Sequence, residues 1–166
     1  MPRPGLLAAL AVLAAPVALS ACATKPQVSS EVTRGANLAA YQTFSFVNAT
    51  PPAGMNPVTF ERIRQDVASA LTAKGYTKAA GQGDLSVIIT LGARERTDIN
   101  TWGAFGRQID VNQYTEGKMA VDVFSTQTQQ PLWHGQATQT IDPNRPDPTV
   151  VDTAVAEVMA RFPPRA

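Results

Sequence analysis

The chain contains only one cysteine and one histidine among its 166 residues. A single cysteine excludes an internal disulfide. Without CxxC pairs or a cluster of cysteine and histidine, no structural zinc site is visible, and we expect no metal. Side-chain packing alone must therefore hold the fold together.

Charge is also scarce, with charged residues at 16% of the chain and a formal net charge of +1. A nucleic-acid binder needs a basic surplus, which this composition lacks. The stretch "GQGD" (Gly81–Asp84) has two glycines, but it precedes a strand and lacks the pattern of a phosphate-binding loop. We therefore expect neither a nucleic-acid partner nor a cofactor.

The longest apolar run is too short for a membrane span. It covers Leu6–Leu19, follows the single positive charge of Arg3, and is interrupted by Pro16. A spanning helix needs about 20 apolar residues, whereas a charged start followed by a short apolar run is typical of a secretory signal. The pattern predicts a signal peptide over residues 1–21.

The run ends at Leu19-Ser20-Ala21-Cys22, which resembles the lipobox of bacterial lipoproteins. The resemblance implies that Cys22 becomes the first residue and carries a diacylglyceryl thioether and an amide-linked acyl chain. Ala23 stands where an inner-membrane retention signal usually has Asp, which implies the outer membrane with the domain facing the periplasm. The alternative is a secretory signal ending in "ALSA" (Ala18–Ala21), which would leave Cys22 as a free thiol.

Removal of residues 1–21 leaves 145 residues, which is the length of one domain. The 14 Lys and Arg lose Arg3 and then equal the 13 Asp and Glu, so the net charge is near zero. Residues 22–40 comprise the lipidated N-terminus that the lipobox resemblance implies and a flexible tether, which their polar composition with Pro26 and Gly35 predicts. We expect a single domain over residues 41–164.

Two helices are predicted from their caps. Asn56 and Asp147 are typical N-cap residues, and proline follows each at the first helical position. Gly75 stands where a left-handed residue would end the first helix. Apolar residues recur at helical spacing in both segments: Phe60, Ile63, Val67, Ala70 and Leu71, and then Val151, Val155, Val158, Met159 and Phe162.

Strands are predicted at Tyr41–Val47, at Asp84–Ala93 and in a hairpin over Tyr114–Ile141. The order is strand, helix, strand, hairpin, helix. It predicts an α+β fold, a two-layer α/β sandwich with a mixed, mostly antiparallel sheet of about four strands and both helices on one face. Arg94–Gln113 shows no clean period, so we expect ragged strand ends joined by a long loop.

Several segments together resemble an uncharacterised family of bacterial envelope lipoproteins, the domain of unknown function 4136. They are "YQTFSF" (Tyr41–Phe46), "LTAKGY" (Leu71–Tyr76), "GDLSVIIT" (Gly83–Thr90), "YTEGKMAVDVFSTQTQQPLWHGQA" (Tyr114–Ala137) and "FPP" (Phe162–Pro164). The family usually shows Trp-Arg-Gly where this chain has Trp133-His134-Gly135. The resemblance implies an α/β sandwich in an envelope lipoprotein, and it implies no catalytic residue.

Catalytic chemistry has few candidates. His134 is the only histidine, and it lies on a predicted strand in a chain that has no GxSxG motif, so we interpret it as an ordinary strand residue. No spacing selects a carboxylate pair for acid–base chemistry. The carboxylates considered are Glu95, Asp98, Asp110, Glu116 and Asp122.

The Asn100–Arg107 stretch is the candidate binding loop. Trp102 and Phe105 lie there among glycines, followed by Arg107. Exposed aromatics in a long loop favour recognition. The alternative is that both rings fold back over the end of the sheet as part of the core. Trp133 is predicted to be a core residue.

Three functions are compatible with these features. The first is a non-enzymatic module that is anchored to the outer membrane, faces the periplasm and binds or assembles an envelope protein. The second is a carrier or sensor with a pocket between helices and sheet for a lipid or another small apolar ligand. The third is a carboxylate-dependent hydrolase.

Overall fold

A computed structural model describes residues 25–48, 50–53, 55–102, 108–142 and 147–165. The predicted signal peptide, residues 1–21, and Cys22 lie outside these residues. The chain forms, in order, β1 (Gln27–Val32), η1 (Leu38–Ala40), β2 (Thr43–Phe46), α1 (Pro57–Ala73), β3 (Thr77–Lys78), β4 (Leu85–Trp102), β5 (Gln108–Ser125), β6 (Pro131–Ile141) and α2 (Pro148–Ala160).

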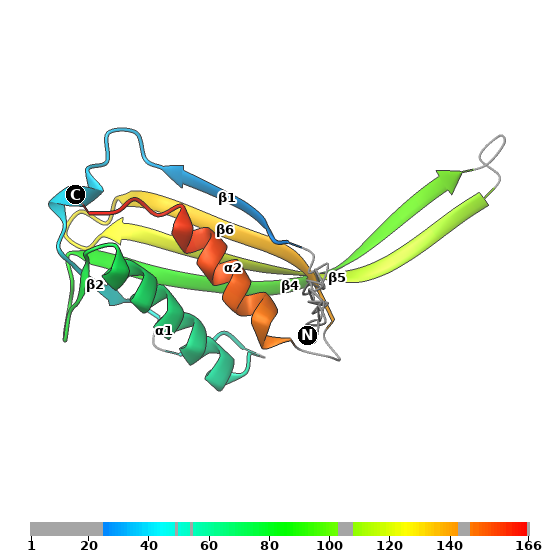
Figure 1. Ribbon diagram of the computed structural model, residues 1–166, viewed down its shortest axis with the longest axis horizontal. Helices are drawn as coiled ribbons and strands as arrows, with labels where there is room; N and C mark the ends of the chain where they lie inside the picture. The colour runs from blue at the N-terminus through cyan, green and yellow to red at the C-terminus, as the bar shows by residue number, and fades with distance from the viewer. Residues whose placement is uncertain (1–24, 49, 54, 103–107, 143–146, 166) are drawn as a thin grey trace, which may run out of the picture.

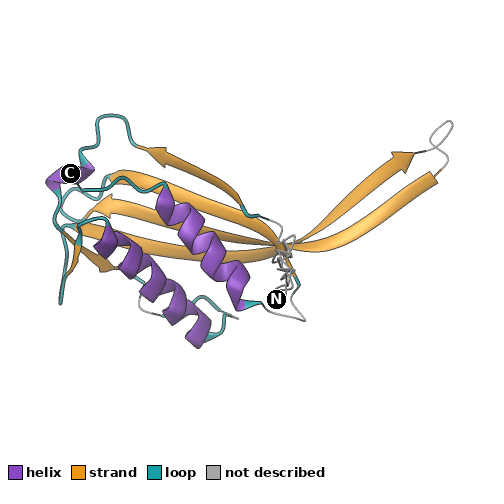
Figure 2. Ribbon diagram, in the orientation of Figure 1, coloured by secondary structure: helices purple, strands orange, loops and turns teal. Residues whose placement is uncertain are grey.

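The strands form one mixed sheet in the order β1-β6-β5-β4-β2-β3. β2 runs parallel to β3 and β4, whereas the β4/β5, β5/β6 and β1/β6 pairs are antiparallel. α1 and α2 lie side by side over the same face of the sheet (Figure 1, Figure 2). The predicted α+β class is confirmed, but the sheet has six strands instead of about four.

The strands missed by the sequence analysis lie at the two edges of the sheet. β3 has two residues, and β1 pairs with β6 from Gln27↔Thr138 to Val32↔Trp133. The flexible tether expected over residues 22–40 is thus too long, because β1 begins at Gln27 and Leu38 is buried. β1 is mostly exposed and polar. Backbone hydrogen bonds to β6 therefore hold β1 in the sheet. Such bonds require no apolar side chains, so the sequence shows no apolar pattern there.

Both predicted helix caps are present. The Asn56 side chain accepts a hydrogen bond from the N–H of Val58 at 2.8 Å, and Asp147 accepts one from the N–H of Thr149 at 2.9 Å. These bonds satisfy N–H groups that have no partner within the first turn of a helix. Gly75 has a φ of +92°, the left-handed conformation predicted for the end of α1.

The core lies between the helices and the covered face of the sheet. Alternate residues of β4 face their antiparallel partners on β5, so that Val87 pairs with Val123 and Ile89 pairs with Val121. All four side chains are buried. The helices complete this core with the apolar stripes that the sequence predicts: Phe60, Ile63, Val67 and Leu71 from α1, and Val155, Val158 and Met159 from α2.

An aromatic cluster closes the core where the chain leaves α2. Phe162 lies edge-to-face between Trp133, at a centroid distance of 5.0 Å, and Tyr76, at 5.5 Å. Trp133 is buried, as predicted. Burial also raises the pKa of the Tyr76 phenol, which keeps that group neutral within the cluster.

Asp84, just before β4, forms hydrogen bonds with the backbone at the start of β2. It should therefore make the free energy of unfolding depend on pH. Its carboxylate accepts hydrogen bonds from the N–H groups of Gln42 and Thr43, each at 3.0 Å, and these bonds lower its pKa. Stability gained this way is present above the unfolded-state pKa and is lost as pH falls through the folded-state pKa. We expect Asp84→Asn to cost about 1 kcal/mol at pH 7. In urea titrations that difference should shrink below about pH 4.

Candidate functional site

A cavity of about 300 Å³ lies between the helices and the sheet, at the end where both helices begin. We call it the helix–sheet pocket. Its lining is predominantly apolar and comes from the loop before α1, from both helices and from three strands. Representative lining residues are Met55, Ile63, Leu91, Met119, Val151 and Ala154.

The pocket exists because side chains on the covered face become small at this end of the sheet. On the covered face of β4, Ile89 and Leu91 are followed toward this end by the small Ala93. On the covered face of β5, the residue next to Met119 toward the same end is Gly117. Ala93 and Gly117 form a cross-strand pair in the pocket lining. The helices continue over this region, so the missing side-chain volume stays open.

The second candidate site is a two-stranded extension, which we call the β4–β5 arm: Arg96–Trp102 of β4 and Gln108–Tyr114 of β5. The two strands pair without a break to Trp102↔Gln108, whereas pairing of β6 with β5 begins only at Thr115. Figure 1 shows the arm projecting away from the helices and the rest of the sheet. Its Ile99 and Val111 form a cross-strand pair, and their exposed fractions are 65% and 56%.

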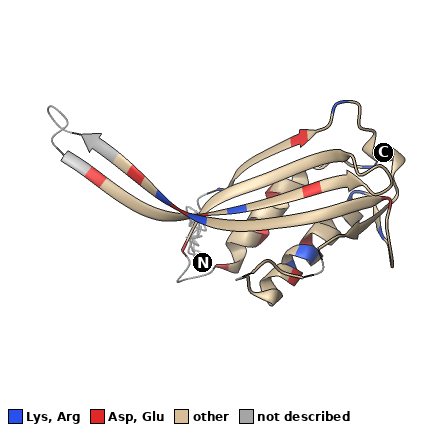
Figure 3. Cartoon of the chain, turned by 180° about the vertical axis from the view of Figure 1, so that it is seen from behind, with Lys and Arg blue, Asp and Glu red and all other residues tan. Residues whose placement is uncertain are grey.

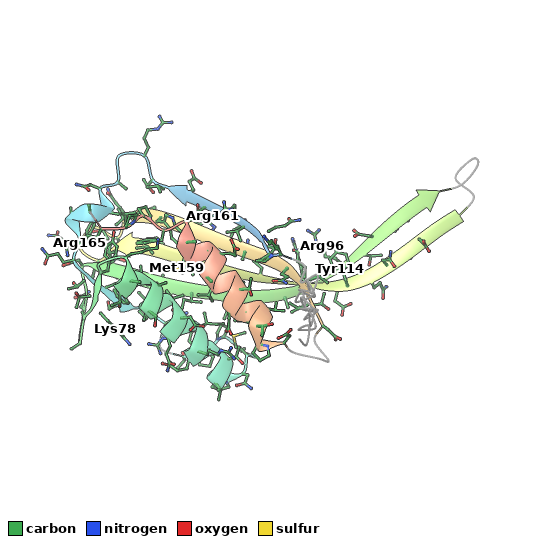
Figure 4. All side chains as sticks on the ribbon, viewed as in Figure 1. Lys78, Arg96, Tyr114, Met159, Arg161 and Arg165 are labelled. Carbon is green, nitrogen blue, oxygen red and sulfur yellow. The ribbon has the colours of Figure 1, made fainter. Side chains whose placement is uncertain are left out.

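The base of the arm carries an ion-pair cluster. Glu116 accepts hydrogen bonds from Nε and an Nη of Arg94 at 2.8 Å and 2.6 Å, and one from Arg96 at 3.5 Å. The Arg94 hydrogen bonds hold the pKa of Glu116 below its ordinary value. Figure 4 shows Arg96 and Tyr114 at the point where the arm leaves the body. The cluster ties both strands together at this point.

The face of the sheet opposite the helices is uncovered and carries mixed charge. Figure 3 shows acidic and basic residues interspersed along its strands, with basic positions near the base of the arm. His134 lies on this face, and its Nδ1 is 2.6 Å from Oδ1 of Asp122. None of the hydrogen bonds among the described residues joins this pair to a hydroxyl or a thiol. Within the described ranges, the pair is thus a partly exposed cross-strand contact between β5 and β6.

The other carboxylates do not converge with Asp122. Asp98 and Asp110 lie on the arm, Glu95 is opposite Thr115, and Glu116 is held by arginines. Within the described part of the chain, no group of three His, Cys, Asp or Glu side chains is placed to hold a metal ion.

Over Arg94–Gln113 the sequence predicts ragged strand ends joined by a long loop, whereas the structure has two strands that pair regularly up to Trp102↔Gln108. Trp102 is the last residue of β4, so it does not belong to a loop, while Phe105 and Arg107 lie outside the described residues. The regular pairing was not predicted because the side chains of Arg96–Ile99 and Asp110–Gln113 are exposed on both faces of the arm, and so the sequence there has no apolar alternation. The pocket was also missed as a specific site. Its only signal is the small residues in "LGA" (Leu91–Ala93) and "EGKM" (Glu116–Met119) at inward positions.

Fold and site together define a two-layer α+β domain with an apolar pocket and a projecting β-hairpin. The chain belongs to the family described as Domain of unknown function (DUF4136), whose model matches residues 28–164. The family resemblance seen in the sequence is thereby confirmed. No curated protein matches the chain. In the part of the chain that is described, neither helix is long and apolar enough to cross a membrane.

The fold resembles that of a solved structure at low sequence identity. A PDZ domain protein from Parabacteroides distasonis matches with a TM-score of 0.60 and 14% identity, over 84% of this chain and 36% of that protein. The chain thus corresponds to about a third of that protein's length. Two structures of the PelC dodecamer from Paraburkholderia phytofirmans match with TM-scores of 0.49 and 0.47, each at 13% identity over 85% of this chain and 99% of PelC.

Proposed function

We propose that this protein is a lipoprotein anchored to the outer membrane through Cys22, whose periplasmic domain binds or assembles an envelope protein without enzymatic activity. The lipobox-like sequence Leu19–Cys22 supports the anchor. The main support for the binding role is the projecting β4–β5 arm with its exposed apolar pair.

The arm has the properties of a segment that needs a partner. A two-stranded ribbon by itself is marginally stable in water, and its unpaired edges are templates for a further strand. Among the described residues, no third strand pairs with the arm. The exposed pair of Ile99 and Val111 adds apolar surface in the same place. A protein partner that packs on this pair, or adds a strand to an edge, would satisfy both features.

The arm predicts a specific loss of binding. We expect Ile99→Thr with Val111→Thr to reduce partner capture at least tenfold, because apolar contact worth about 1.4 kcal/mol or more is removed while β-branched side chains are kept. The measurement uses a photoreactive residue at Thr97 of the arm, crosslinked in intact cells, with the yield of each captured protein compared between variants. The melting temperature should stay within about 2 °C.

The body of the protein offers a matched control. Val47 and Val58 are exposed to 59% and 77%, similar to the arm pair. Val47→Thr with Val58→Thr should leave the capture yield unchanged. Equal losses in both double variants, or no loss in either, would remove the arm from the binding role.

The helix–sheet pocket favours a second candidate function, the carriage or sensing of a small apolar ligand. Ligand pockets begin at about 300 Å³, are mostly apolar and contain a few polar groups. The pocket meets each of these criteria, with Thr59 and Gln139 among its polar lining residues.

A further inference from the structure

The chain enters the body beside the helix–sheet pocket. β1 begins at Gln27, and its second residue, Val28, pairs with Ala137 of β6, which lines the pocket. Val28 also packs against the core from the covered face. Figure 1 shows this start of β1 at the same end of the sheet as the start of α2. The segment that leads to Cys22 therefore reaches the body at the pocket end.

The distance from Cys22 to the pocket is short. Cys22 precedes Gln27 by five residues. Five fully extended residues span at most about 18 Å. A long acyl chain attached at Cys22 could thus reach the pocket from any conformation of the intervening segment that turns back toward the body.

The chemistry of the pocket also fits such a chain. Its floor is made of small residues, Ala93, Gly117 and Ala137, between the larger apolar side chains of Leu91 and Met119. A pocket of about 300 Å³ with this apolar lining suits a hydrocarbon chain. In the pocket, the methylene groups of an acyl chain that has left the bilayer would be shielded from water.

We propose that one acyl chain carried by Cys22 folds back into the helix–sheet pocket and occupies it. The inference rests on the proposed lipidation of Cys22. Occupancy would fasten residues 22–26 against the body and keep the domain close to the membrane, while the remaining acyl chains stay in the bilayer.

The test uses the full-length protein in intact cells, with a diazirine amino acid at Ala93. This residue is exposed and lines the pocket. After illumination and digestion, mass spectrometry should find the acylated N-terminal peptide joined to the peptide that contains position 93. The same probe at Thr90, an exposed residue on the uncovered face of the same strand, should give at least tenfold less of this product. A probe at Val151 of α2, which lines the pocket from the other side, gives an independent measurement.

Each other outcome has a definite meaning. An acylated N-terminus with no crosslink from position 93 or 151 overturns the pocket proposal and leaves the proposed function intact. A crosslink to a separate lipid also overturns it, and supports carriage of a free apolar ligand. An N-terminal peptide without acyl groups removes the anchor itself, and with it both proposals.

Discussion

Gly135→Ala is expected to lower the free energy of unfolding by about 3 kcal/mol, although it adds one methyl group. A Cβ at position 135 would lie 2.1 Å from Cη2 and 2.6 Å from Cζ2 of Trp133. Both distances are far below van der Waals contact. The indole therefore packs directly against the backbone of Gly135. Urea unfolding of wild type and Gly135→Ala measures the difference in the free energy of unfolding.

The indole has little room to move away. Trp133 is 1% exposed and contacts the ring of Phe162, which in turn contacts Tyr76. A shift of Trp133 would thus displace the whole aromatic cluster. Overpacking of a well-filled core forces such shifts, and its typical cost is about 1–3 kcal/mol. We place this substitution at the upper end because two buried rings would have to follow the first.

Two variants separate this contact from a general effect of glycine in a strand. A Cβ at Gly92 of β4 meets nothing within 4 Å, so Gly92→Ala should change stability by less than about 1 kcal/mol. Trp133→Phe removes the ring atoms nearest to position 135. The cost of Gly135→Ala should fall by at least about 1 kcal/mol in that background. Equal costs in both backgrounds would show that the contact is not the cause.

The same tryptophan illustrates what the sequence could predict. Trp133 was expected in the core because it is large and lies on a strand, and that expectation is confirmed. The need for glycine two residues later was not anticipated, because it depends on the rotamer with which the indole folds back along its own strand. Helix caps were predictable for the opposite reason. Asn56 and Asp147 act on N–H groups within a few residues, so all partners lie in one short segment.

The candidate sites were harder to anticipate than the core. β1 and the β4–β5 arm are stabilised by backbone pairing with little apolar burial, so neither produces the alternation that identifies a buried strand. The helix–sheet pocket is a space left by Ala93 and Gly117, and absent side chains carry a weak signal. The candidate loop was proposed because of its aromatic residues. The exposed apolar pair of the arm is instead Ile99 and Val111, on strands whose length the sequence did not predict.

Cys22→Ser should release the protein from the membrane, the second large effect that we expect. A single acyl chain binds a membrane with a constant of only about 10⁴ M⁻¹, whereas several chains hold a protein stably. Loss of all chains should therefore move at least about nine tenths of the protein to the soluble fraction, unless residues 1–21 are retained as an uncleaved apolar segment. Fractionation with mass analysis of the N-terminus distinguishes these products. Ala21→Gly, which keeps a small residue before the cysteine, should remain anchored.

Mass analysis of the wild-type N-terminus distinguishes the lipoprotein signal from an ordinary secretory signal. Cleavage after Ala21 with a bare Cys22 thiol, and a soluble wild-type protein, would contradict the anchor and support an ordinary secretory signal. The melting temperature of the same variant tests the proposed occupancy of the helix–sheet pocket. Pairing of β1 with β6 begins at Gln27, so Cys22→Ser should leave the sheet intact. Loss of an acyl chain that occupies the pocket should nevertheless lower the melting temperature of the released protein by more than about 2 °C relative to the anchored form, once detergent effects are matched, because a ligand that binds only the folded state stabilises it. A shift within about 2 °C would contradict occupancy of the pocket.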